Sequence, residues 1–157
     1  MNRLRLPIAA ILLLGLTACG NAKKPATLTT EYDQKEMDAA IESAKKSFGE
    51  FKARMLQPQE GDKGFAIKVP IKDSNGTEHF WLNDINVQGE EFSGVIGNEP
   101  GIVKCVKMGE SYKFKAADIS DWMYMSKGVM QGNYTLHVLL KTMPAEEAKD
   151  LKRRIGW

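Results

Sequence analysis

The residues best suited to chemistry lie close together in one short segment. Glu78, His79 and Trp81 bring a carboxylate, an imidazole and a large aromatic ring into a single stretch. An exposed tryptophan beside a histidine is typical of a surface that binds a partner or ligand. Side chains alternate along a strand, so His79 and Trp81 should share a face with Lys68 of the preceding strand. The alternative is that a helix over 31–56 covers this face and makes these residues part of the packing.

A second candidate patch is formed by Asp121 and Trp122, with Tyr124 nearby. This patch could extend the binding surface. The competing interpretation is structural. In it, Asp121 caps a turn of helix, as aspartate often does, and Trp122 fills the core.

A metal site would require several candidate ligands to converge, namely Glu78, His79, Asp84, Asp121 or His137. The chain has two histidines, and they do not form an HxxH, HxxxH or HExxH motif. We also find no GxSxG elbow, P-loop or dinucleotide fingerprint. The sequence therefore predicts no metal and no other cofactor, and it favours binding over catalysis.

The first residues have the organisation of a signal peptide. Arg3 and Arg5 are the only charges before a wholly apolar run over 7–16 that is interrupted only by Gly15. This run is shorter than the roughly 20 apolar residues needed to span a bilayer. It also lacks the polar positions that the wet face of a surface helix would show.

The segment Leu16-Thr17-Ala18-Cys19 resembles the lipobox of bacterial lipoproteins, directly after the apolar run. The resemblance implies removal of residues 1–18, lipidation of Cys19 and anchoring of the protein in a membrane. Gly20 stands where an aspartate commonly signals retention in the inner membrane, which implies the outer membrane with the protein facing the periplasm. Residues 19–30 would then be the lipidated cysteine and a polar tether.

Charge and length limit the possible roles of the remaining chain. The formal net charge of the whole chain is +2, and cleavage would remove two arginines and no acid. A neutral mature protein gives no support for nucleic-acid binding, which needs a basic face. Residues 31–157 suit one small domain. Cys105 would be the remaining cysteine. The alternating pattern around it favours a small buried side chain in a strand; the alternatives are a reactive thiol and an intermolecular disulfide.

Hydrophobic periodicity predicts an α+β domain: a small antiparallel sheet or partly open barrel of about five to seven strands, with one N-terminal and one C-terminal helix. Apolar residues between Glu31 and Leu56 recur at helical spacing, with Asp33 and Glu36 in capping-box spacing. This helix is expected to pack on the domain, in preference to forming a coiled-coil dimer. A second helix is predicted over Pro144–Ile155, with Gly156 as its stop.

Between the helices the period changes to two residues. Strands are predicted over 65–71, 85–87, 92–96, 102–106, 112–114 and 134–140, with 118–125 ambiguous between a helical turn and a strand and 126–132 as a loop. Asn75-Gly76 is predicted as the two-residue loop of a hairpin. In that register Ile71 faces Phe80 and Val69 faces Leu82.

Several short motifs carry a family likeness. They are Glu78-His79-Phe80-Trp81, Phe92-Ser93-Gly94 with Asn98-Glu99-Pro100, Gly109 to Phe114, Ile119-Ser120-Asp121-Trp122, and Gly132-Asn133-Tyr134-Thr135. With these motifs the segment 65–140 resembles a family of small bacterial domains of unknown function, typified by the YegJ-like lipoproteins. The resemblance implies a compact α+β domain and no mechanism.

The sequence thus predicts a lipid-anchored protein of the cell envelope that acts as a binding module, with a possible envelope protein as partner. Glu78, His79, Trp81, Asp121 and Trp122 are the expected binding residues, and Cys19 the lipidated one. The alternative is a small envelope hydrolase or metal-dependent protein that uses Glu78, His79 and Asp121.

Overall fold

A computed structural model describes residues 32–157. The predicted signal peptide, Cys19 and the tether lie outside the described residues. In the described part no helix is long and apolar enough to cross a membrane.

The core of the fold is an antiparallel sheet in the order β4-β3-β2-β1-β5-β6. Its strands are β1 (Asp62–Asp73), β2 (Gly76–Gln88), β3 (Glu91–Ile96), β4 (Ser111–Lys115), β5 (Asp121–Ser126) and β6 (Val129–Gly132). The chain builds the sheet outward from β1 to β4, then returns to place β5 against the free side of β1. The predicted α+β class is confirmed, and the sheet is open, with β4 and β6 as its edges.

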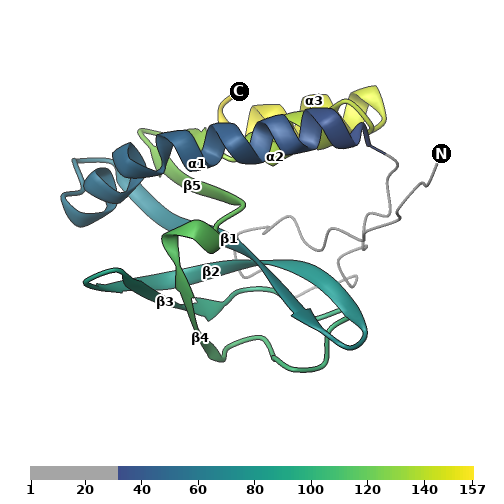
Figure 1. Cartoon of the computed structure of the whole chain (residues 1–157). Coiled ribbons are helices and arrows are strands. Elements are labelled where there is room, and N and C mark those ends of the chain that lie inside the picture. The colour runs from purple at the N-terminus through teal and green to yellow at the C-terminus, as the bar shows by residue number, and fades with distance from the viewer. Residues whose placement is uncertain (1–31) are drawn as a thin grey trace, which may run out of the picture.

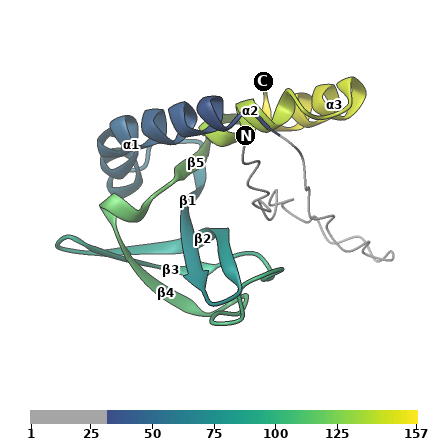
Figure 2. The same cartoon turned by 45° about the vertical axis from the view of Figure 1, so that its right-hand side comes forward.

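Three helices of the described chain lie at one end of the molecule: α1 (Gln34–Leu56), α2 (Tyr134–Leu140) and α3 (Ala145–Ile155). A single 3-10 turn (Ala116–Asp118) precedes β5. In Figure 1 and Figure 2 the helices form a layer above β2, β3 and β4, and β1 runs from that layer to the opposite end. One more helix is present than the sequence predicted, because α2 occupies a predicted strand.

The helix α1 begins and packs as its sequence pattern predicts. The carboxylate of Asp33 accepts a hydrogen bond from the backbone N–H of Glu36, which satisfies one of the free donors of the first turn. Phe48 and Phe51 of its apolar face enter the main core cluster, so α1 packs on the sheet. Its buried face supplies most of its stability, since isolated helices are marginal in water.

The hairpin between β1 and β2 forms where predicted, but its register differs by two residues. Asp73 pairs with Gly76, so Ser74 and Asn75 form the loop, and Val69 faces Phe80. The Asp73 carboxylate accepts a hydrogen bond from the backbone N–H of Asn75 and fixes this turn. Because the shift is an even number of residues, every side chain stays on its predicted face.

Two predicted strands are absent. Residues 102–106 form an irregular loop, and the predicted burial of Cys105 is wrong because its side chain is exposed. Backbone N–H groups of this loop bond to carboxylates, as with Lys104 and Asp73, and no ladder forms. The predicted strand over 134–140 is the helix α2.

The remaining segments agree more closely with the pattern. The ambiguous residues 118–125 contain both the end of the 3-10 turn and most of β5, while the predicted loop over 126–132 holds the short strand β6. The C-terminal helix is confirmed as α3, and Gly156 ends it with a φ of 80°.

Candidate functional site

The sheet brings Lys68, His79, Trp81 and Asp121 together on one face. Lys68 lies across from Trp81 on β2 and across from Asp121 on β5, and His79 lies opposite Pro70. The prediction that Lys68, His79 and Trp81 share a face is therefore confirmed. We call the face that carries these four residues the polar face.

The helix α1 covers the other face of the sheet. Its phenylalanines pack in one cluster with Ile67, Val69, Phe80 and Leu82, whereas Trp81 forms a separate cluster with Ala66, Met123 and Met130. The alternative in which the N-terminal helix covers His79 and Trp81 is therefore wrong. Trp81 is nevertheless only 3% exposed. Its ring therefore contributes packing, and little of it is available to a partner.

Lys68 is the central residue of the polar face, and the sequence indicated it only as a neighbour of His79 and Trp81. Its side chain is 4% exposed, and its Nζ lies 4.6 Å from the centre of the Trp81 ring. The ammonium donates a hydrogen bond of 2.6 Å to Oγ1 of Thr135. Burial lowers the pKa of Lys68, and the nearby Asp121 carboxylate partly opposes that shift. A lysine at an inward position of an otherwise apolar strand is the signal that could have identified it.

Asp121 holds the start of α2 against the sheet. Its fully buried carboxylate accepts hydrogen bonds from the backbone N–H groups of Trp122, Tyr134 and Thr135 and from the Thr135 hydroxyl. Two of these N–H groups belong to the first turn of α2, where helical donors have no partner within the helix. A negative charge at this end is also favoured by the helix dipole. Asp121 is thus a cap supplied by another element.

Trp122 points away from Asp121, to the side of the sheet covered by α1. Its ring stacks on Phe51 at a centroid distance of 5.0 Å, and its indole N–H donates to the backbone oxygen of Ala44 in α1. The structural alternative for this pair, a capping aspartate and a core tryptophan, is the arrangement observed.

His79 is hydrogen-bonded to Ser120, the residue directly before β5. Its Nδ1 lies 2.9 Å from Oγ of Ser120, whose hydroxyl in turn donates to the backbone oxygen of Lys68. Since that hydroxyl has one proton, Nδ1 of His79 carries a hydrogen and donates, which leaves Nε2 as an acceptor. Burial, and to a lesser degree the Lys68 charge, lowers the pKa of His79 to about 4. The imidazole is therefore neutral at pH 7.

Glu78 lies on the opposite face from His79, beside Ile71. Its 1%-exposed carboxylate accepts hydrogen bonds from the backbone N–H groups of Gly101, Ile102 and Val103. It therefore fixes the loop between β3 and β4. Asn98 of the same loop accepts a hydrogen bond from the N–H of Trp81, and its Nδ2 has no partner within residues 32–157.

The predicted catalytic or metal-binding trio is thus not assembled. Glu78 faces away from His79, and the Asp121 carboxylate is occupied by the start of α2. Within residues 32–157 no group of three or more histidine, cysteine, aspartate or glutamate side chains could hold a metal ion. On the polar face, Nε2 of His79 can accept a hydrogen bond, whereas the Lys68 ammonium is buried against Thr135 and Trp81. Whether these groups bind a partner stays a prediction.

Comparisons with known proteins agree with the sequence resemblance. The model of a family described as "Uncharacterized protein conserved in bacteria (DUF2314)" matches residues 34–157. The uncharacterized protein YegJ of Escherichia coli is 42% identical over 144 residues, which cover 91% of this chain and 93% of that protein. A putative ankyrin repeat protein of Neisseria meningitidis serogroup B is 38% identical over 85 residues, or 52% of this chain and 34% of that protein. No solved structure matches.

Proposed function

Because the chain belongs to the DUF2314 family, whose description assigns no activity, we propose from its own residues that it is a lipid-anchored binding module of the cell envelope. In this proposal Cys19 carries the lipid, the outer membrane is the site of anchoring, and the domain faces the periplasm. The domain binds an envelope partner and performs no catalysis.

The sequence before α1 supports the anchor. A basic start, an apolar run and the Leu-Thr-Ala-Cys segment occur in the order that lipoprotein export requires. The alignment with YegJ spans 144 residues, while the family match begins at residue 34, so the similarity also takes in part of this leading segment.

One observation carries the binding role: the two carboxylates that could have served chemistry are instead bonded to backbone N–H groups. Glu78 holds the 101–103 loop, and Asp121 holds the start of α2. The oxygens of each carboxylate accept several hydrogen bonds from the protein itself, which leaves few of their lone pairs for a substrate. The polar face, on which His79 is neutral at pH 7, therefore suits recognition better than turnover.

The Neisseria relative adds a further point in favour of binding. The matching segment makes up a third of that protein, whose printed description is that of an ankyrin repeat protein. Ankyrin repeats stack into extended binding surfaces. A similar segment thus occurs in a protein whose description names a class of module that serves interactions.

The contact between His79 and Ser120 is the one feature that favours the alternative, a small hydrolase. A serine hydroxyl within hydrogen-bonding distance of a histidine can become a nucleophile. However, the Ser120 proton is directed to the backbone oxygen of Lys68, and the side chain is 3% exposed. Assay of the purified lipoprotein against ester and peptide substrates tests this alternative, and turnover that disappears in Ser120→Ala would establish it.

The anchor is tested by the intact mass of the protein purified from envelopes. We expect a chain that begins at Cys19 and carries acyl groups, and a Cys19→Ala variant that accumulates as a larger, unacylated precursor. An unacylated wild-type protein would refute the anchor.

The binding role is tested by affinity capture from detergent-solubilised envelopes. The full lipoprotein, His79→Ala and the control Lys107→Ala, which alters an exposed residue on the β3–β4 loop, are compared by mass spectrometry of what they retain. We expect one protein to be retained by the wild type and the control and lost from a His79→Ala variant that is still folded. If all three proteins retain the same partner equally, the polar face is not the binding surface.

A further inference from the structure

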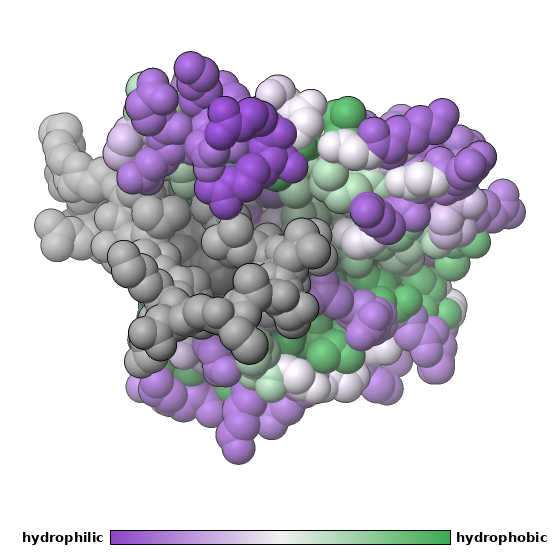
Figure 3. Space-filling view, turned by 180° about the vertical axis from the view of Figure 1, so that it is seen from behind, coloured by the Kyte–Doolittle hydropathy of each residue, from purple (hydrophilic) through white to green (hydrophobic). Residues whose placement is uncertain are grey.

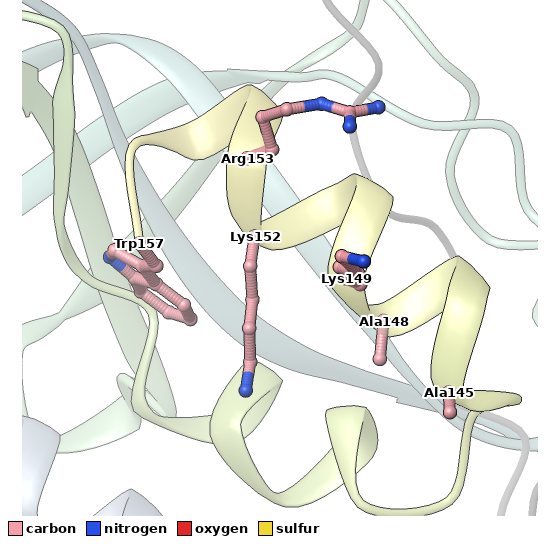
Figure 4. A pocket seen from close by; sticks show the side chains of 6 residues that line it. All are labelled: Ala145, Ala148, Lys149, Lys152, Arg153 and Trp157. Carbon is pink, nitrogen blue, oxygen red and sulfur yellow. The ribbon is translucent and has the colours of Figure 1, made fainter.

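The C-terminal helix α3 has a stripe of cations on its exposed side. Ala145, Ala148, Lys149 and Lys152 follow one another at spacings of three, one and three residues, which aligns them along the helix. With Arg153 and Trp157 they line a surface hollow. Figure 4 shows Ala145, Ala148 and Lys152 projecting from one side of α3, with the Trp157 ring beside Lys152.

The two lysines of this stripe, Lys149 and Lys152, are not paired with an acid among residues 32–157, although Glu146 lies three residues before Lys149 in the same helix. Asp150, the acid nearest to them in sequence, is paired with Arg153 and Arg154 and lies off the stripe. Seen from behind, one dense group of hydrophilic residues lies at the upper left of the molecule, the end where α3 lies, and other hydrophilic groups lie at the right and lower edges (Figure 3).

A rigid aromatic side chain borders the cations. Trp157 stacks on His137 of α2 with ring centroids 4.0 Å apart, and its indole N–H donates to the backbone oxygen of Met130. The ring is half-buried, with part of it open to solvent. An amphipathic ring next to lysines is the combination that proteins place at the boundary between lipid headgroups and water.

The chain also enters the domain beside this helix. Tyr32, the first described residue, packs against the cluster to which Ala148, Leu151 and Trp157 also belong. The segment between Cys19 and Tyr32 has 12 residues, and a chain of that length reaches at most about 40 Å even when fully extended. A lipid on Cys19 would therefore hold α3 close to the membrane surface at a high effective concentration.

We propose that the Lys149–Lys152 stripe and Trp157 bind the phosphate groups of anionic phospholipids and so fix the orientation of the domain on its membrane. This inference rests on the proposed lipid anchor. With α3 toward the membrane, the loop between β3 and β4, which lies at the opposite end in Figure 1, points away from it. The phosphates pair with the two lysines, and the small side chains of Ala145 and Ala148 let the headgroups approach the helix.

The test uses the acylated lipoprotein in vesicles of phosphatidylethanolamine, with and without phosphatidylglycerol. The readout is quenching of tryptophan fluorescence by lipids brominated in the upper part of the acyl chain. Trp81 and Trp122 are 3% and 6% exposed, so Trp157 is the reporter, and Trp157→Phe gives the background.

We expect quenching that requires phosphatidylglycerol, decreases with salt and disappears in Lys149→Glu/Lys152→Glu. Each basic residue near an anionic surface contributes roughly a factor of five, so losing two lowers the contact equilibrium at least about 25-fold, and the two glutamates add repulsion from the anionic surface. The matched control is Lys104→Glu/Lys107→Glu, which makes the same charge change on the β3–β4 loop and should quench like the wild type.

Quenching that is equal in both vesicle types, or equal in the two double variants, would overturn the proposal. The intact mass of the same preparation separates this result from failure of the anchor. If the protein is acylated but its quenching does not depend on anionic lipid, the anchor is supported and the α3 contact is refuted. If the protein is not acylated, the anchor itself is refuted.

Discussion

The two faces of β1 are both buried, yet they are held by different forces. On one face Ile67 and Val69 pack against Phe51 and the aromatic residues around it. On the other face Lys68 sits between Trp81 and Asp121. Consecutive residues of one strand therefore enter an apolar core and a hydrogen-bonded network. Alternation along a strand separates the two environments completely.

The difference affects how each face tolerates change. Apolar contact is non-directional, so its contribution follows the area and volume that are buried. The polar face depends on directed hydrogen bonds, and removing one partner leaves the other buried without compensation. Substitutions on the two faces should therefore differ in kind as well as in size.

The largest effect is expected on the apolar face. Phe51 is 1% exposed and touches Phe48, Trp122 and Phe65. Phe51→Ala should lower the free energy of unfolding by about 4 kcal/mol, because it leaves a cavity between α1 and the sheet. Urea denaturation measures this, with Phe51→Leu as a milder control. A loss below about 1 kcal/mol would contradict the assignment of the core.

On the polar face Asp121→Asn should cost about 3 kcal/mol, since it weakens the cap on α2 and removes the counter-charge of Lys68. A double-mutant cycle that combines Asp121→Asn with Lys68→Met measures how strongly the two residues interact. If the two residues are coupled, the double variant is more stable than the sum of the single losses predicts. If the two losses of stability are strictly additive, Asp121 stabilises the start of α2 and does not interact with Lys68.

His79 gives the polar face a dependence on pH that the apolar face lacks. Its pKa is about 4 in the folded protein and near 6.5 when unfolded. The unfolded chain thus binds the proton first, and stability falls as pH decreases from 6.5 to 4. The loss attributable to His79 should be roughly 2–3 kcal/mol. Urea titrations of wild type and His79→Gln between these pH values should diverge, and parallel curves would contradict the shift.

A smaller and local effect is expected at Glu78. Glu78→Gln keeps the shape of the side chain but weakens its bonds to the N–H groups of Gly101 and Ile102. We expect a loss of about 1–2 kcal/mol. Amide hydrogen exchange should speed up at residues 101–103 while α1 stays protected, and uniform acceleration throughout the domain would argue against a local role.

The smallest effect is expected at Cys105, which is exposed on the β3–β4 loop. Cys105→Ser should change stability by less than about 0.5 kcal/mol. Labelling of the native protein with a thiol reagent should be complete without denaturant. Protection of the thiol would mean that the loop buries this residue after all.

The local patterns of the sequence were sufficient for several elements. The helical spacing of Phe48 and Phe51, the period of two in β1 and β2, and the glycine after α3 each depend on contacts between near neighbours. For the same reason the shared face of Lys68, His79 and Trp81 could be predicted. Even a register error of two residues leaves each side chain on the same face of the sheet.

Where distant groups decide the conformation, the pattern was insufficient. Tyr134–Leu140 alternates like a strand, but its first N–H groups bond to Asp121 on β5, and its apolar side chains pack against Met37 of α1. The segment 102–106 also alternates, but Glu78 and Asp73 take its N–H groups. In both cases a carboxylate far away in sequence settles the backbone hydrogen bonds.

The sequence by itself determined the α+β class, the long first helix, the last helix and which residues share the polar face. These features follow from periodicity, capping and parity, which are local. Only the tertiary structure decided that Asp121 caps α2 and that Lys68 is buried between Trp81 and Asp121. The pairing of β5 with β1 brings these groups together across more than 50 residues of chain, and no local pattern carries that information.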